Sequence, residues 1–303
     1  MKKPGFFIAG LLFLILIVGA SVIYLHDHQQ AGNTSPTGLS NNQTPAAQEK
    51  VQEPSKEQPG AVSAEKPYVL PILGSSGRLT KAQVASMDQW RKSVREMALQ
   101  QPEEIILNGK ADQKAVSLTF DDGPDGVITP QVLTLLKNRG IYATFFFVGK
   151  QMESYPQVVK DAAAQGHLIL SHTYSHPQLD HLQQAAMQKE VERTDQLLVK
   201  LISQQPVGLR PPYGAINTDV VTQLERQGKV IILWSIDTLD WTGTDAKNVA
   251  ANVLDNVRPG DIILMHSISG RNNTLAALPL IIDGLREKGY SIVRVDQLLD
   301  RRL

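Results

Sequence analysis

Short apolar runs alternate with longer helical patterns through residues 115–303. The apolar runs cover 115–120, 143–148, 167–170, 230–234 and 261–266. Helical patterns lie between them at 182–202 and 274–288, and Thr129-Pro130 is typical of a helix N-cap with proline at the first helical position. This alternation predicts repeated βα units and a parallel sheet, which the pattern leaves either open or closed into a barrel.

Polar residues follow the apolar runs at the points where strands should stop. They are Asp121, His172, Arg210, Asp237 and His266. Barrels and open α/β sheets both keep their sites at the carboxyl ends of parallel strands, so we expect these side chains to converge.

A further helix is predicted ahead of these units. The sequence Thr80-Lys81-Ala82-Gln83 has the spacing of a capping box. Apolar residues follow it at helical spacing, and we interpret them as core. They are Val84, Met87, Val94 and Met97, with Trp90 expected to pack beside them.

The N-terminus resembles a targeting element. Lys2 and Lys3 precede an apolar run over 6–25, about the 20 residues that a membrane-spanning helix needs. The lysines predict an anchor with the rest of the chain on the outer side of the membrane. A cleaved signal peptide is the alternative, because Val18-Gly19-Ala20 loosely resembles a cleavage site.

Composition sets the domain boundaries. Residues 29–66 are rich in Gln, Asn, Ser, Thr, Pro, Glu and Lys and contain no aromatic residue, which predicts a disordered linker. We therefore expect an anchor or signal segment at 1–28, the linker at 29–66, and folded sequence from residue 67 onward that begins with a short extension carrying a helix.

Charge and cysteine content limit the partners and the metal ligands that the chain can have. The chain carries 30 basic and 30 acidic residues and no basic stripe interleaved with aromatic residues, so no nucleic-acid partner is expected. It has no cysteine, which excludes disulfides and thiolate zinc sites. Any bound metal must therefore use histidine and carboxylate ligands.

Four residues have the composition of a metal-assisted hydrolytic site. Asp121 and Asp122 end an apolar strand, and His172 and His176 lie four residues apart in a chain with seven histidines. Two imidazoles and one carboxylate form a catalytic zinc set that leaves one coordination position open. The two histidines would share a face if their segment were helical. Four other histidines are interpreted as core or surface residues, namely His26, His28, His167 and His181.

Five motifs in order resemble the polysaccharide deacetylases of the NodB-homology, carbohydrate esterase 4 type. They are Thr119-Phe120-Asp121-Asp122-Gly123-Pro124, His172-Thr173-Tyr174-Ser175-His176, Arg210-Pro211-Pro212-Tyr213-Gly214, Asp237-Thr238-Leu239-Asp240-Trp241 and Leu264-Met265-His266. The resemblance covers residues 114–303, which it identifies as the catalytic domain, and leaves 67–113 as the short extension with a helix. It implies a distorted (β/α) barrel of about seven βα units. It also implies one divalent metal ion, for which we expect zinc, with Co, Ni and Mn as alternatives.

The resemblance assigns the metal ligands and the base. Asp122, His172 and His176 would bind the metal. Asp121 would be the general base, and Arg210, on a loop stiffened by two prolines, would orient it.

The acid and the substrate contacts come from the later motifs. His266 ends an apolar strand and is our candidate general acid, which needs a carboxylate partner to raise its pKa. The resemblance gives Asp240 that place. Tyr213, Trp234 and Leu264 would line the acetyl pocket. The roles of Asp237 and Trp241 stay open.

Two positions depart from the family pattern. Ser171 stands where the family often has Asn, and Ser267 follows His266 where an acid is usual. Neither change removes a ligand or catalytic group, so we expect effects only on surrounding hydrogen bonds, metal preference or rate.

The sequence therefore predicts a polysaccharide N-deacetylase, with peptidoglycan N-acetylglucosamine as the leading substrate. Chitin oligomers, other glucosamine polymers, N-acetylmuramic acid and acetylated xylan are alternatives, and so is a catalytically silent carbohydrate-binding protein or a structural envelope protein. We expect a monomeric catalytic domain, held by a single membrane pass outside a bacterial plasma membrane or secreted after cleavage.

Overall fold

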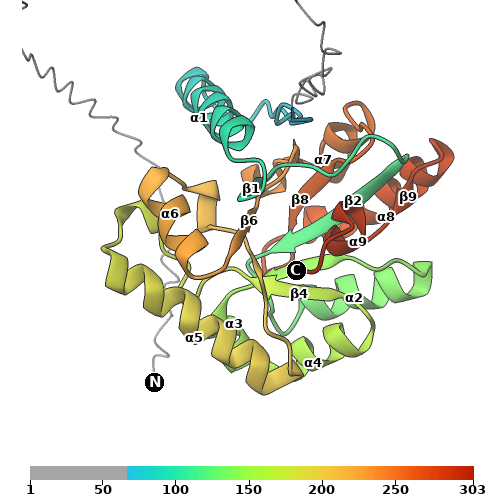
Figure 1. Ribbon diagram of the computed structural model, residues 1–303. Coiled ribbons are helices and arrows are strands. Elements are labelled where there is room, and N and C mark those ends of the chain that lie inside the picture. The colour runs from blue at the N-terminus through green and yellow to red at the C-terminus, as the bar shows by residue number, and fades with distance from the viewer. Residues whose placement is uncertain (1–66) are drawn as a thin grey trace, which may run out of the picture. The chain divides into compact units, whose positions relative to one another are not determined.

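A computed structural model describes residues 67–303 of the protein. The predicted anchor at 1–28 and linker at 29–66 lie outside the described residues. A nine-stranded sheet runs through this part, and Figure 1 shows its strands in the middle with helices around them. Strands β1 to β9 span Ile105–Ile106, Ala115–Asp121, Thr144–Phe147, Leu168–Ser171, Gly208–Leu209, Val230–Ile232, Ile236–Asp237, Ile262–His266 and Ser291–Ile292.

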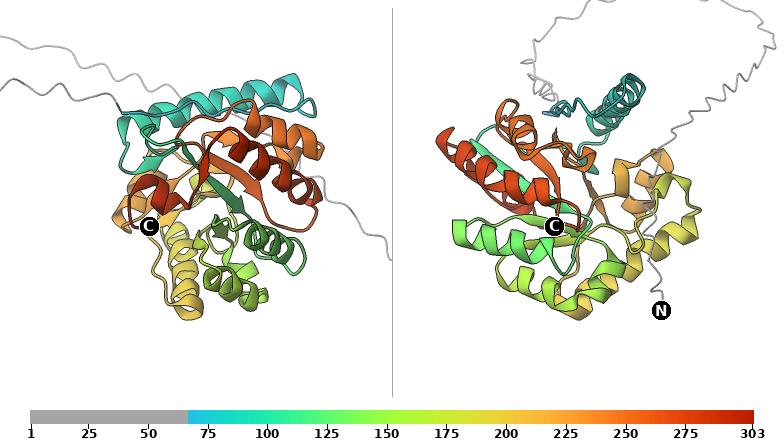
Figure 2. Two further views of the ribbon diagram at one scale, coloured as in Figure 1. Left: turned by 90° about the vertical axis from the view of Figure 1, so that its right-hand side faces the viewer. Right: turned by 180° about the vertical axis from the view of Figure 1, so that it is seen from behind.

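Nine α-helices occur in the described part of the chain. Helices α1 to α9 span Lys81–Gln100, Ile128–Arg139, Gly149–Ser154, Pro156–Ala164, Gln184–Ile202, Thr218–Arg226, Ala246–Leu254, Asn272–Glu287 and Val295–Leu299. Both views in Figure 2 place α1 on the opposite side of the sheet from α2 and α4. None of the helices within 67–303 has the length and apolar character needed to cross a bilayer.

The strands pair in the order β1-β6-β5-β4-β3-β2-β8-β7, with β9 pairing separately with β2, and all the ladders are parallel. The predicted α/β architecture is confirmed, but closure into a barrel is not. In residues 67–303 no ladder joins the end strands β1 and β7, so the sheet remains open. Strands of two residues at its ends present too few hydrogen-bonding groups to complete a barrel.

Alternation along the strands sorts side chains onto the two faces of the sheet. Phe145 and Phe147 of β3 join one buried cluster with α2, α4, α7 and α8, while Phe146 joins a second cluster on the other face. Burial of each such ring contributes about 2 kcal/mol. On β2 this second face carries Thr119 and Asp121, so the same alternation brings polar groups to the inside.

The extension at the N-terminal side packs on this inner face. Helix α1 begins after Thr80, whose side chain and that of Gln83 form the predicted capping box. Trp90 of α1 lies against Trp234, with ring centroids 5.4 Å apart, and its Nε1 donates to the Gly214 carbonyl at 3.1 Å. The predicted helix and the packing of Trp90 are confirmed.

The predicted start of the next helix is wrong by two residues. Helix α2 begins at Ile128, and Thr129 lies inside it. The side chain that caps it is Asp125, whose Oδ1 accepts from the backbone N–H of Thr129 at 2.8 Å and of Val127 at 3.2 Å. An acceptor three residues before the helix start satisfies the same free N–H groups that an N-cap would.

Candidate metal and acid–base site

The two adjacent acids separate because the backbone turns between them. Asp121 is the last residue of β2, and its register partner on the neighbouring strand β8 is His266. Asp122 has φ of 71°, in the left-handed region. The two side chains are therefore separated by the change of backbone region at Asp122 and not by the alternation of an extended strand.

Arg210 holds Asp121 in a dry pocket. Its Nη1 donates to Asp121 Oδ1 at 2.8 Å and to Thr119 Oγ1 at 2.9 Å, and the arginine is fully buried. The remaining donors reach the carbonyl oxygens of Ile232 at 2.9 Å and Leu233 at 2.8 Å. Burial lowers the Arg210 pKa, and the Asp121 carboxylate opposes that shift. Four of the five guanidinium N–H groups thus have acceptors, and Asp121 is fixed in one orientation.

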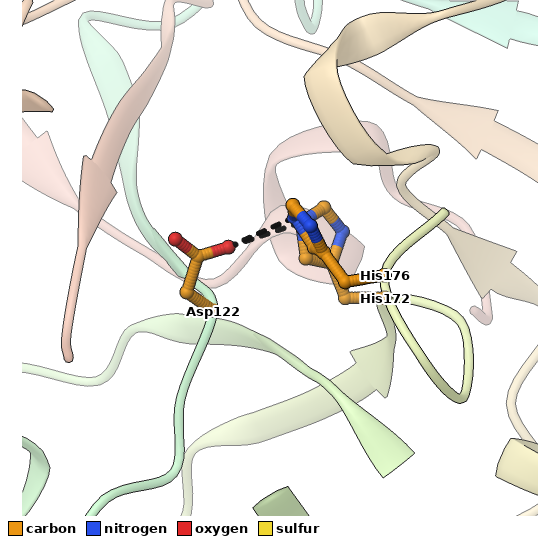
Figure 3. A group of neighbouring side chains, drawn as sticks. All are labelled: Asp122, His172 and His176. Atoms are coloured by element: carbon orange, nitrogen blue, oxygen red, sulfur yellow. Dashed lines mark ion pairs between the residues drawn. The ribbon is translucent and has the colours of Figure 1, made fainter. Parts of the chain in front are cut away.

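Asp122, His172 and His176 converge as predicted. Asp122 Oδ1 lies 3.1 Å from His176 Nε2 and 3.6 Å from His172 Nε2. Figure 3 shows the carboxylate facing the two imidazole rings, which lie beside each other. One ligand atom from each residue falls within a group whose members are at most 4.8 Å apart.

The tautomer of His172 suits metal binding. Its Nδ1 lies 2.7 Å from the backbone carbonyl of Arg210, an oxygen that only accepts, so Nδ1 carries the hydrogen. The lone pair of the neutral ring is then on Nε2, which faces Asp122. Orientation of a ligating imidazole by a carbonyl at its other nitrogen is usual in metal sites.

The segment between the two histidines is a loop. It follows β4, and both Thr173 and His176 have positive φ, 64° and 62°. The condition under which His172 and His176 would share a helix face is therefore not met. Their rings nevertheless meet edge to face, with centroids 4.9 Å apart, because the loop curls back on itself.

This donor set fits a divalent cation of the zinc type. It offers two imidazole nitrogens and one carboxylate oxygen and leaves other coordination positions free. Burial would raise the Asp122 pKa, but the neighbouring imidazoles of His172, His176 and His266 outweigh it and hold that pKa well below its usual value. Asp122 is therefore ionised at neutral pH, as a ligand must be.

His266 and Asp240 form a second histidine–carboxylate pair. The Nδ1 atom of His266 lies 2.7 Å from Asp240 Oδ1, and its backbone N–H donates to Oδ2 at 2.8 Å. Thr274 Oγ1 also donates to Oδ2, at 2.5 Å. Burial works to lower the His266 pKa, but the Asp240 carboxylate prevails and raises it to about 9. His266 is thus cationic at neutral pH.

The predicted substrate-contact residues occupy different environments. Tyr213 is 55% exposed, and its ring meets that of His176 with centroids 4.8 Å apart. Trp234 and Leu264 are buried on the inner face of the sheet, where Trp234 lies beside the Arg210 guanidinium.

The residues with open roles shape the loop after β7. Asp237 Oδ1 accepts from the backbone N–H of Leu239 at 2.9 Å and from Trp241 Nε1 at 3.3 Å. Burial raises the Asp237 pKa. Both contacts stay within the loop that carries Asp240, so Asp237 and Trp241 stabilise its conformation.

The histidines left out of the site are placed as expected where the structure describes them. His167 is buried, accepts the Ala143 N–H at Nδ1 over 3.1 Å, and has its pKa lowered to about 4 by burial. His181 is exposed. His26 and His28 lie outside the described residues.

A cavity opens beside the metal-type donor set. It has a volume of about 270 Å³. Its lining residues are Asp122, Val148, Lys150, Gln151, Ser175, His176 and Ile268. Because Asp122 and His176 face it, a substrate group entering the cavity would meet the donor set directly.

Comparison with known proteins supplies relatives for this arrangement. The family model described as polysaccharide deacetylase matches residues 108–232. A peptidoglycan-N-acetylglucosamine deacetylase of Bacillus cereus is 38% identical over 194 residues, covering 63% of this chain and 70% of the relative. A chitooligosaccharide deacetylase of Rhizobium leguminosarum is 34% identical over 199 residues, covering 62% of this chain and 93% of the relative.

A solved structure extends the likeness to the fold. The crystal structure of the Bc1960 peptidoglycan N-acetylglucosamine deacetylase superposes with a TM-score of 0.66 at 35% identity. The match covers 68% of this chain and 97% of that one. Nearly the whole length of the solved relative is therefore represented here.

Proposed function

The chain belongs to the polysaccharide deacetylase family, and we propose that it removes N-acetyl groups from amino sugars of a cell-surface polysaccharide by metal-assisted hydrolysis. One observation carries the proposal. An open set of three metal-type donors lies beside an arginine-held carboxylate and a histidine whose pKa is about 9. Amide hydrolysis needs an activated water, a polarised carbonyl and an acid for the departing amine.

Each group has a distinct task in this proposal. A divalent cation, which we take to be zinc, would be held by Asp122, His172 and His176 and would supply Lewis-acid polarisation of the acetyl carbonyl and acidification of water. Asp121, fixed by Arg210, accepts the proton of the attacking water. His266 donates its proton to the amine nitrogen as the C–N bond breaks, so that acetate and a free amino sugar leave.

The positions of the substrate contacts follow from the same arrangement. Tyr213 packs against the outward ring of His176 and is free to contact the sugar. The buried Trp234 and Leu264 supply apolar surface on the inner face for the acetyl methyl group. These three roles are part of the proposal.

We take peptidoglycan N-acetylglucosamine as the substrate. Two relatives carry that activity in their names, and chitin oligosaccharides are the second candidate because another relative is a chitooligosaccharide deacetylase. Lys150 lines the cavity, and no ion pair to it occurs within residues 67–303. A free cation there suits a polymer that bears carboxylates, as peptidoglycan does, better than neutral chitin.

The place of action in the proposal is the outer side of a bacterial plasma membrane. The support is the sequence alone, namely two lysines before an apolar run over 6–25 and a polar segment over 29–66. A monomeric catalytic domain on a single membrane pass would reach polymer close to the membrane.

The decisive experiment measures acetate release by the purified full chain. It is incubated with chitopentaose, muropeptides or acetylated xylan after chelation and reloading with Zn, Co, Ni or Mn. We expect release from amino-sugar substrates with at least one metal, and mass spectrometry to locate the lost acetyl groups. Binding of glycan without release would support a silent carbohydrate-binding protein, and release from xylan alone would support an acetyl esterase.

A further inference from the structure

The first residues of helix α3 hold the middle of the loop that carries both histidines. The backbone N–H of Gly149 donates to the Thr173 carbonyl at 2.9 Å, and that of Lys150 donates to the Tyr174 carbonyl at 2.9 Å. The two helices α3 and α5 pack against each other beside this loop. A Cβ at position 149 would lie 2.5 Å from the Tyr174 ring and 2.9 Å from Tyr174 Cα, so the approach of α3 to the loop needs a glycine.

A single carboxylate on α5 holds the last part of the loop. Glu190 Oε2 accepts the backbone N–H of Ser175 at 2.7 Å, and Oε1 accepts the Ser175 hydroxyl at 2.8 Å. Ser175 directly precedes His176. Both oxygens of Glu190 are therefore committed to the residue adjoining one of the metal-type donors, and hydrogen bonds to an ionised acceptor are short and strong.

The loop needs such support because its backbone is unfavourable by itself. Thr173 is β-branched and His176 is bulky, yet both have φ above 60°. Residues in this region persist only where the surroundings determine their conformation. The carbonyl of Arg210 fixes His172 at the start of the loop, but His176 has no such partner on its ring among the described residues, apart from Asp122 itself.

We infer that Glu190 is a positioning residue of the metal site, placing His176 against Asp122 through its two hydrogen bonds to Ser175. The inference rests on the proposed function in one respect, that Asp122, His172 and His176 bind a divalent cation. Glu190 acts before the ion arrives, because it holds the loop in the ligating conformation and so removes the cost of ordering it on binding. Removing a residue that orients a ligand weakens metal affinity by about 10- to 100-fold.

The test is a zinc titration of the full chain against a chromophoric chelator. We expect the zinc dissociation constant to rise about 10- to 100-fold in Glu190→Ala. The dissociation constant should rise less in Glu190→Gln, because an amide oxygen still accepts one of the two hydrogen bonds. It should rise least in Ser175→Ala. The matched control is Glu192→Gln, an exposed glutamate on the same helix, which should bind zinc as the wild type does.

A second readout separates positioning from damage to the fold. Acetate release by Glu190→Ala should recover toward the wild-type rate when zinc is in large excess, because the weakened step is binding. A merely structural lesion would lower the unfolding midpoint in chelator and would leave the rate low at any zinc concentration.

Two results would overturn the inference. One is a zinc dissociation constant in Glu190→Ala equal to that of the wild type. The other is a lowered rate that excess zinc does not restore. If Glu190→Ala does not fold, Ser175→Ala decides, since it removes one hydrogen bond and keeps the backbone contact. If the wild type itself binds no divalent metal, the proposed function fails and the inference fails with it.

Discussion

The site contains two histidine–aspartate groups that differ in almost every physical respect. In the first, Asp122 faces His172 and His176 directly at the edge of a cavity, and its side chain is 23% exposed. In the second, Asp240 is fully buried, and its two oxygens accept from the ring Nδ1 and the backbone N–H of His266 and from the Thr274 hydroxyl. The same residue types are thus arranged once as an open group and once as a closed pair.

The difference shows how the surroundings decide the chemistry of a carboxylate. Asp240 has its acceptor sites occupied by protein donors, so its charge acts on one imidazole and raises the pKa of His266 to about 9. Asp122 faces two ring nitrogens, one of which, His172 Nε2, has no hydrogen to donate when the ring is neutral. The closed pair is therefore suited to holding a proton and the open group to holding a cation.

Breaking the open group should have the largest effect. Asp122→Asn removes the anionic ligand, so we expect loss of bound zinc and a fall in acetate release of about a thousandfold or more, since Lewis-acid stabilisation supplies several kcal/mol. The measurement is zinc content by mass spectrometry alongside acetate release. Chelation of the wild type should give the same loss, reversed by adding metal. Normal turnover in the chelated variant would contradict the assignment.

Breaking the closed pair should lower the rate and leave zinc in place. In Asp240→Asn the His266 pKa should fall from about 9 toward its ordinary 6.5. His266 must be protonated to act as the acid, so activity is lost as pH rises through that pKa. We expect the alkaline limb of the pH–rate profile to shift to lower pH and the rate at pH 8 to fall about 10- to 100-fold.

The zinc dissociation constant at pH 7 provides the contrast between the two groups. It should be unchanged within a factor of about two in Asp240→Asn, since Asp240 touches none of the three donors. An unmoved alkaline limb would mean that His266 is not the acid.

The closed pair should also make stability depend on pH. Folding raises the His266 pKa from an ordinary 6.5 to about 9, so the folded state binds this proton more tightly than the unfolded chain. The resulting stabilisation, about 3 kcal/mol, is complete below pH 6.5 and is lost as pH rises through 9. Urea unfolding in chelator at several pH values measures it. The pH dependence should flatten in Asp240→Asn, and an equally steep curve would contradict this origin.

The smallest expected effect concerns the rim of the open group. Lys150→Gln removes the cation from the cavity lining, so KM for carboxylate-bearing muropeptides should rise about three- to fivefold at low salt, the range of an exposed charge pair. KM for neutral chitopentaose is the internal control and should stay constant. Lys150→Arg should resemble the wild type. An equal rise in KM for both substrates would show that Lys150 does not favour the carboxylate-bearing substrate.

The longer strands were predictable from sequence and the short ones were not. The five mainly apolar runs all contain strands, because nearly all of the strand residues are buried and both faces of the sheet are covered. Strands β1, β5, β7 and β9 have two residues each, and two residues have no periodicity to detect. Whether the sheet closes depends on these short strands, which explains why the pattern left an open sheet and a barrel undecided.

The residue types at the site were predictable, but its backbone was not. Strand ends and the family motifs located Asp121, Asp122 and His266. The left-handed conformations of Asp122, Thr173 and His176 depend on contacts with distant elements, and none of these residue types indicates them.

The polar side chains that hydrogen-bond to the site residues were not predicted from the sequence either. Glu190, Thr274 and Thr119 contact site residues far along the chain. Each is an ordinary polar residue in a helix or strand. In a single sequence no local signal separates such a residue from its solvent-exposed neighbours, because its importance arises only when the fold brings the partner close.

Arg210 contacts both the proposed base and one of the metal-type donors, the first with its side chain and the second with its backbone. Its guanidinium holds Asp121, and its own carbonyl accepts from His172. The separation between the proton acceptor and one ligand is therefore set by the conformation of a single, fully buried arginine and two hydrogen bonds. A movement of β5 would carry both groups together, so their mutual spacing would survive a distortion that displaced either of them from Asp122.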